Sequence, residues 1–163
     1  MKVGIVSLGC SKNLIDSQTA MKYLVRAGHE FTNNPREADA IIVNTCAFIE
    51  SAKQEAIDNI LEMAELKKTG QIKKILVTGC MAQRYKNDVL NELPEVDGIL
   101  GTGSYNKIVD AIEQTMLGAD YRSFEDIHAP VEEIDRVLTT PPWFAYLRIA
   151  EGCDNRCAYC IIP

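Results

Sequence analysis

Six cysteines divide into two sets of three, and both sets have surroundings typical of metal-cluster ligands. One set occupies a single loop: Cys153, Cys157 and Cys160. The other set is dispersed, with spacings of 36 and 34 residues, and each member ends an apolar, β-branched run: Cys10, Cys46 and Cys80. An iron–sulfur cubane normally takes four cysteine thiolates. Two sets of three therefore predict two iron–sulfur clusters, each with one iron open to another ligand.

Zinc is the alternative for the cysteines of the loop. Structural zinc is tetrahedral, with Cys or His completing the shell, and neither His29 nor His128 has close spacing to these cysteines. For the dispersed set the alternative is simple burial, because free cysteine often behaves as a small hydrophobic side chain. Three cysteines at equivalent strand ends favour ligands over burial.

Strand and helix patterns alternate from Met1 to about Gly118. Apolar, β-branched runs predict strands at 2–7, 30–32, 40–43, 74–77 and 97–100. Apolar residues at helical spacing predict helices at 13–27, from about 51 to Gly70, at 82–93, and from a cap at 104–107 to Leu117. This order predicts the fold class α/β, with a doubly wound parallel sheet and helices on both faces.

The predicted sheet explains how cysteines far apart in sequence can meet. Ligands of such sheets bind outside the carboxyl ends of the strands. All these ends lie along one edge when the strands are parallel, so Cys10, Cys46 and Cys80 are expected to converge there.

The chain is expected to contain one domain and the start of another. Residues 1–121 form the first domain, and the acidic, proline-broken residues 122–142 form a linker. A strand at 143–149 then delivers the loop of clustered cysteines. The sequence stops just past this loop, so 143–163 are expected to be an incomplete second domain.

Composition limits the partners that this chain can have. The chain has 163 residues, of which 47% are hydrophobic and 25% charged, and a net charge of −6. It has no Lys/Arg-rich tract, which makes nucleic acid binding unlikely for this segment and suits a basic protein partner. It has neither a leader nor an apolar run of about 18 residues, so we expect a reducing cytoplasm and no membrane.

Three further residues are candidates for cofactor contacts. Asn13 and Asn44 neighbour two of the dispersed cysteines and could orient ligands, although Asn13 could equally cap a helix. Tyr159 could pack on a cofactor ring, and a structural aromatic in a short loop is about as good an explanation.

The motif Cys153-x-x-x-Cys157-x-x-Cys160, with Tyr159 before its last cysteine, resembles the signature of radical S-adenosylmethionine enzymes. Residues 1–121 resemble the N-terminal domain of the methylthiotransferases among them. Four stretches are similar to the branch that modifies a ribosomal protein (RimO type): SLGCSKNLIDS at 7–17, NTCAFIESA at 44–52, GCMAQRY at 79–85 and AEGCDNRC at 150–157. The transfer-RNA branch usually has Gln-Met-Asn after its first cysteine, where this sequence has Ser-Lys-Asn.

This resemblance implies two 4Fe-4S clusters and S-adenosyl-L-methionine as cofactors. The clustered cysteines would hold the cluster that cleaves S-adenosylmethionine to a radical, and the dispersed cysteines would hold the sulfur to be inserted. The implied reaction places a methylthio group on the β-carbon of an aspartate in small-subunit ribosomal protein twelve. It implies no catalytic residues beyond the cluster ligands, and an electron donor such as flavodoxin or ferredoxin.

Two alternatives remain open at this point. The chain could belong to a transfer-RNA methylthiotransferase, or it could be a non-catalytic metal-binding or redox-sensing module. Most of the family's barrel and its C-terminal domain have no counterpart in these 163 residues. The chain is therefore expected to be a fragment that is inactive alone.

Overall fold

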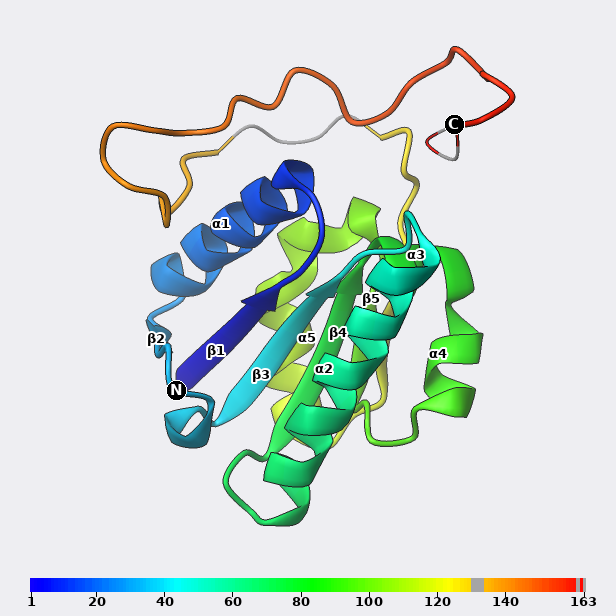
Figure 1. Cartoon of the computed structure of the whole chain (residues 1–163). Helices are drawn as coiled ribbons and strands as arrows, with labels where there is room; N and C mark the ends of the chain where they lie inside the picture. The colour runs from blue at the N-terminus through cyan, green and yellow to red at the C-terminus, as the bar shows by residue number, and fades with distance from the viewer. Residues whose placement is uncertain (130–133, 161, 163) are drawn as a thin grey trace.

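A six-stranded parallel β-sheet forms the centre of the computed structural model, which describes residues 1–129, 134–160 and 162 (Figure 1). Its spatial order is β2-β1-β3-β4-β5-β6, and every adjacent pair is parallel. The strands are β1 (Lys2–Ser7), β2 (Glu30–Phe31), β3 (Ala40–Thr45), β4 (Lys74–Gly79), β5 (Gly98–Leu100) and β6 (Tyr121–Ser123). The predicted α/β class and parallel sheet are confirmed.

Helices cover both faces of the sheet, which confirms the doubly wound arrangement. One face carries α1 (Ser11–Arg26) and α5 (Ile108–Met116) (Figure 1). The other carries α2 (Glu50–Lys68), α3 (Cys80–Tyr85) and α4 (Asn87–Glu92). The short 3₁₀ helices η1 (Pro35–Glu37) and η2 (Thr102–Lys107) connect elements. The strand order reverses between β1 and β3, and ligands of such sheets bind at this switch point.

The central strand β3 supplies side chains to two hydrophobic cores. Ile41 and Val43 pack in the core on the α2 side, and Ala40 and Ile42 pack in the core on the α1 side. Every residue of β3 is buried. A strand covered on both faces needs a continuous apolar run rather than an alternating one, which is the pattern that predicted it. Each fully buried isoleucine contributes about 1.5–3 kcal/mol to stability.

The helix predicted at 82–93 is wrong, because the structure contains two short helices there. Lys86, between α3 and α4, has a φ of +43°, which an α-helix does not accommodate. Its Nζ lies 5.5 Å from the ring centroid of Phe124, a residue far along the chain. Neither Gly nor Pro marks this position, so the local pattern gives no signal for the break.

Strand β6 was not predicted, and it extends past residue 121, where the first domain was expected to end. Hydrogen bonds to Ser104 hold this strand in place. Ser104 was expected to cap a helix, but it lies buried within η2. The Ser104 hydroxyl accepts from the Glu125 N–H at 3.0 Å and from the Ser123 hydroxyl at 3.2 Å. The division of the chain into domains stays a prediction.

The strand predicted at 143–149 is wrong. These residues pair with no strand among the residues that the structure describes. Side chains contact their carbonyl groups instead: the Thr140 hydroxyl donates to Phe144 O at 2.5 Å, and the Arg136 guanidinium donates to Tyr146 O. The apolar pattern of a strand needs a neighbouring strand to complete it, and none of the described residues supplies one.

Residues 134–160 cross the carboxyl edge of the sheet beside α1 as an extended segment (Figure 1). The Val137 N–H donates to Gln18 O at 3.1 Å, and Gln18 Nε2 donates to Thr139 Oγ1 at 3.0 Å. The segment that leads to the second set of cysteines thus lies at the same end of the sheet as the first. Among the described residues, no helix combines the length and apolar character needed to span a membrane.

Gly79, just before Cys80, should tolerate no side chain. Its φ and ψ are +94° and −161°, a region that is essentially restricted to glycine. A Cβ there would lie 2.8 Å from Thr45 N and closer still to Thr45 O and Asn44 Oδ1. We expect Gly79→Ala to lower the free energy of unfolding by about 4 kcal/mol, from strain and overlap together, as measured by urea denaturation.

Gly118→Ala is the matched control. Gly118 has a φ of +91°, but a Cβ there would meet nothing within 4 Å. Only the cost of a left-handed conformation applies, about 1–2 kcal/mol. Equal losses for the two variants would refute the close approach at Gly79.

Candidate functional site

The dispersed cysteines follow three neighbouring strands at the carboxyl edge of the sheet. Cys10 precedes the first residue of α1, Cys46 follows β3, and Cys80 begins α3. Their exposure differs: Cys10 is exposed, Cys80 is half-buried and Cys46 is buried. All three are free thiols. Contacts between the three segments that carry these cysteines show whether the segments converge.

The side chain of Asn13 connects all three segments. Its Nδ2 donates to Leu8 O at 3.0 Å and to Thr45 O at 2.9 Å, close to Cys10 and Cys46 in the chain. Its Oδ1 accepts a long hydrogen bond from Cys80 Sγ at 3.6 Å. Asn13 is 0% exposed. The structure thus brings the three cysteine-bearing segments together around one buried amide.

Gly9 permits the closest approach between two of these segments. A Cβ on Gly9 would lie 2.5 Å from Cys46 Cβ and 2.9 Å from Cys46 Sγ, and the residue has a φ of +86°. Only glycine allows the turn before Cys10 to pack directly on the Cys46 side chain. This explains why the first cysteine follows a glycine.

Asn44 holds the backbone of Asn13 in place. Its Nδ2 donates to Asn13 O at 2.8 Å and to Ser17 Oγ at 2.9 Å, and its Oδ1 accepts from the Tyr105 hydroxyl at 3.1 Å. Both asparagine side chains are buried and bonded to the protein itself. Their geometry is that of residues that position the cysteines. Their predicted contacts with a cofactor stay a prediction.

The surroundings of Cys80 favour its neutral thiol. Burial raises the pKa of Cys80 to about 11, the Lys12 ammonium opposes this rise, and the neighbouring Cys46 and Cys10 add to it. A metal centre must take its cysteines as thiolates, so its binding releases protons. Three cysteine thiols near one edge of the sheet are donors that suit a centre carrying positive charge.

No group of three or more His, Cys, Asp or Glu residues within 1–129, 134–160 and 162 is placed to hold a metal ion. A single zinc ion draws its thiolates to bonds of about 2.3 Å. An iron–sulfur cluster places its own iron and sulfide atoms between its ligands. The donor set of Cys10, Cys46 and Cys80 fits the chemistry of such a cluster, because it consists of thiols alone.

The second set of cysteines lies in the extended segment, outside the strands and helices. Cys153 and Cys157 are exposed and Cys160 is half-buried. A backbone hydrogen bond of 3.0 Å from Cys160 N to Cys157 O closes a turn between two of them. Tyr159, in that turn, is 92% exposed. The roles of these cysteines and of Tyr159 stay predictions.

Sequence reasoning missed two charged residues beside the dispersed cysteines. The Lys12 ammonium contacts the Asp16 carboxylate at 2.8 Å, one helical turn along α1. Asp16 is only 2% exposed. Burial raises the pKa of Asp16 although Lys12 and Arg148 lie beside it. The i, i+4 spacing of Lys12 and Asp16 was the available signal, but their burial is not visible in the sequence.

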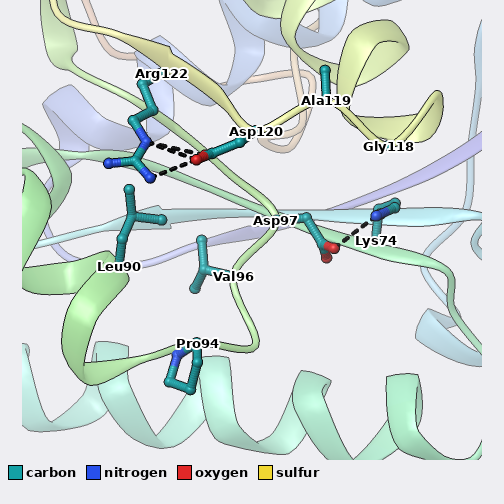
Figure 2. Close-up of a pocket in the computed structure, with 9 residues that line it drawn as sticks. All are labelled: Lys74, Leu90, Pro94, Val96, Asp97, Gly118, Ala119, Asp120 and Arg122. Atoms are coloured by element: carbon teal, nitrogen blue, oxygen red, sulfur yellow. Dashed lines mark hydrogen bonds and ion pairs between the residues drawn. The ribbon is translucent and has the colours of Figure 1, made fainter.

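A hollow of about 360 Å³ lies at the opposite end of the sheet (Figure 2). Its charged residues are paired with one another: Lys74 contacts Asp97 at 2.8 Å, and Arg122 contacts Asp120 at 2.5 Å. Because these side chains are paired with one another, they are not free to bind a charged ligand. The carboxyl edge is therefore the stronger candidate site.

Comparison with known proteins gives one family match and many relatives. The profile of the family described as "Uncharacterized protein family UPF0004" matches residues 2–101. A designed Rossmann 2x3 fold protein solved by NMR aligns with a TM-score of 0.45 and 17% identity, over 80% of this chain and 98% of its own.

Three relatives carry the name "Ribosomal protein uS12 methylthiotransferase RimO". The protein from Lachnoclostridium phytofermentans is 51% identical over all of this chain and 37% of its own length. Those from Solibacter usitatus and Clostridioides difficile are both 49% identical, over all of this chain and 34% and 37% of their own lengths. The chain thus spans little more than one third of these relatives.

Asn13→Ala should loosen the cysteine edge. The change leaves the carbonyl groups of Leu8 and Thr45 without their buried donor, and each unsatisfied group costs about 1–3 kcal/mol. We expect the free energy of unfolding to fall by about 2–4 kcal/mol in urea denaturation. Asn59→Ala is the control, because the Asn59 amide donates to Glu55 O on the exposed side of α2. Equal effects of the two substitutions would argue against Asn13 as the connecting residue.

Asp97→Asn should change how stability depends on pH. Burial by itself raises the pKa of Asp97, but hydrogen bonds from Lys67, Lys74 and the Ile75 N–H outweigh it and hold the pKa below its usual value. The stabilisation is therefore complete above the unfolded pKa of about 3.9 and is lost as the pH falls through the lower folded value.

We expect Asp97→Asn to lower the free energy of unfolding by about 1–3 kcal/mol at pH 7. The difference from wild type should shrink between pH 4 and pH 2, as followed by urea denaturation. Asp120→Asn, which breaks an exposed pair in the same hollow, serves as the control. A difference for Asp97→Asn that stays constant down to pH 2 would contradict the pairing.

Proposed function

This chain belongs to the UPF0004 family, and on that premise we propose that it forms the cluster-bearing N-terminal part of a radical S-adenosylmethionine methylthiotransferase. The proposed substrate is ribosomal protein uS12, in which the β-carbon of an aspartate receives the methylthio group. The convergence of the three dispersed cysteine segments on Asn13 is the observation that carries the proposal. The names and the high identity of the relatives support it.

Each set of cysteines has a separate part in this proposal. Cys10, Cys46 and Cys80 would hold one 4Fe-4S cluster, and Cys153, Cys157 and Cys160 would hold the other. When bound, the clusters supply a radical from S-adenosylmethionine at one open iron and a sulfur atom at the other. Three-cysteine sets support this division, because each leaves one coordination position of a cubane free.

The surrounding residues of the chain would orient the ligands. Asn13 accepts the hydrogen bond of the Cys80 thiol in the cluster-free chain, a bond that ends when the sulfur becomes a thiolate ligand, and Gly9 sets the distance between the Cys10 turn and Cys46. Asn44 holds Asn13 in place. Tyr159 is proposed to lie against the bound S-adenosylmethionine, which its position next to Cys160 supports.

The proposed partners follow from charge and from the reaction. A net charge of −6 suits a basic protein substrate such as a ribosomal protein. Reductive cleavage of S-adenosylmethionine needs an electron, for which a flavodoxin or ferredoxin is the proposed donor. A transfer-RNA substrate is the competing proposal, and a redox-sensing module without catalysis is the proposal from a different class.

The first test measures iron and acid-labile sulfide after anaerobic reconstitution. We expect this chain to bind about four iron and four sulfide atoms per cluster. Replacement of Cys10, Cys46 and Cys80 by alanine should remove one cluster, and the matched replacement of Cys153, Cys157 and Cys160 should remove the other. Unchanged iron in the first variant would overturn the proposed cluster site.

The second measurement separates the two roles in a full-length relative. Alanine at the position equivalent to Cys46 should abolish methylthiolation of uS12 and leave part of the S-adenosylmethionine cleavage. Mass spectrometry of uS12 and of transfer RNA from the same assay identifies the substrate. Equal loss of cleavage and transfer, or a methylthio group on RNA, would contradict the proposal.

A further inference from the structure

Four charged side chains form a closed ring between α1 and the extended segment. The Lys12 ammonium contacts Asp16 at 2.8 Å and Glu151 at 3.0 Å. The Arg148 guanidinium contacts the same two carboxylates, at 3.4 Å and 3.0 Å. Each charge of the ring thus contacts two of opposite sign.

The ring joins parts of the chain that are far apart in sequence. Asp16 and Arg148 are separated by 132 positions. Their side chains are only 2% and 12% exposed, whereas most surface ion pairs are solvated. Solvent therefore screens this contact less than an ordinary surface pair. A buried carboxylate that lost its cations would be left uncompensated, so the two elements are held to one another.

The extended segment presents its charged residue to α1 and its apolar residues to solvent. Arg148 points to Asp16, whereas its neighbours Leu147 and Ile149 are 82% and 90% exposed. Successive side chains of an extended chain point to opposite sides. The charges, rather than apolar burial, thus hold this stretch of the segment against α1.

The ring lies between the two sets of cysteines. Lys12 is two positions after Cys10, and Glu151 is two positions before Cys153. Two residues of chain span at most about 7 Å. The Lys12–Glu151 contact therefore connects the two sets of cysteines through only two residues of chain on each side.

We propose that Lys12 and Asp16 are positioning residues, whose ion pairs with Glu151 and Arg148 hold the loop of Cys153, Cys157 and Cys160 over the edge that carries Cys10, Cys46 and Cys80. The role in bringing two clusters together rests on the proposed function. The docking of the extended segment on α1 does not rest on the proposed function. Transfer of sulfur to a carbon radical requires that both cluster sites reach the same substrate atom. A ring of ion pairs that holds the two sites together would meet this requirement.

Trypsin measures the docking directly. Cleavage after Arg148 requires its side chain to leave Asp16, whereas Arg156 is exposed. In the cluster-free, reduced chain we expect the bond after Arg148 to be cut at least tenfold more slowly than the bond after Arg156. Asp16→Asn should raise the rate after Arg148 at least fivefold and leave the rate after Arg156 unchanged, as followed by mass spectrometry of the fragments.

Two further variants complete this design. Lys12→Met removes the other end of the ring without touching either cleavage site, and it should also raise the rate after Arg148. Asp58→Asn is the matched control, because it removes a carboxylate on the exposed side of α2 that contacts Gln54. It should leave both rates unchanged. Equal rates at the two bonds in the wild type, or no change in either ring variant, would overturn the proposal.

A spectroscopic measurement separates positioning from general stability. After reconstitution and reduction, the wild type should show magnetic interaction between its two clusters in electron paramagnetic resonance. Asp16→Asn should bind the same iron and show a weaker interaction, and an undiminished interaction would contradict the positioning role. If the wild type binds no clusters, the proposed function fails, while the proteolysis still decides whether the ring docks the segment.

Discussion

A single buried amide, that of Asn13, is the contact on which the cysteine edge depends. It satisfies the carbonyl groups that precede two of the cysteines and accepts a hydrogen bond from the sulfur of the third. Each of these groups would be costly to leave unpaired in a buried position. Gly9 and Gly79 lie where these segments approach most closely, against Cys46 and Thr45, and a side chain on either would overlap them. Two glycines and one asparagine thus add specific contacts to the apolar packing at this edge.

The two ends of the sheet use buried carboxylates in opposite ways. At the amino end, hydrogen bonds to Asp97 outweigh its burial and lower its pKa, which is the signature of a stabilising contact. At the carboxyl end, burial outweighs the cations around Asp16 and raises its pKa. Keeping a buried carboxylate ionised costs free energy when burial outweighs its cations. Proteins accept this cost more often where they position reactive groups than where a contact only adds stability. The two edges thus place their buried carboxylates in different electrostatic surroundings.

The sequence predicted most elements of the sheet domain and failed where long-range contacts decide the backbone. The apolar run of β3 was visible because burial on both faces leaves no polar alternation. The break at Lys86 and the strand β6 had no local signal: Lys86 contacts Phe124, and Ser104 bonds to the backbone of Glu125 just after β6. Residues 143–149 have the pattern of a strand but pair with none among the described residues. The local residue pattern shows that a segment favours the extended conformation, but a strand forms only where a neighbouring strand pairs with it.

By itself the sequence determined the donor chemistry, because residue type and spacing are written in it: three thiols at three strand ends and three in one loop. It also determined the parallel topology that brings strand ends to one edge. Only the tertiary structure decided that Asn13 and Asn44 bond to the protein rather than point outward, and that Lys12 and Asp16 meet Arg148 and Glu151. The physical reason is that hydrogen bonds and ion pairs between distant segments depend on burial and on distances of a few ångströms. Neither quantity has a periodic signal in the chain.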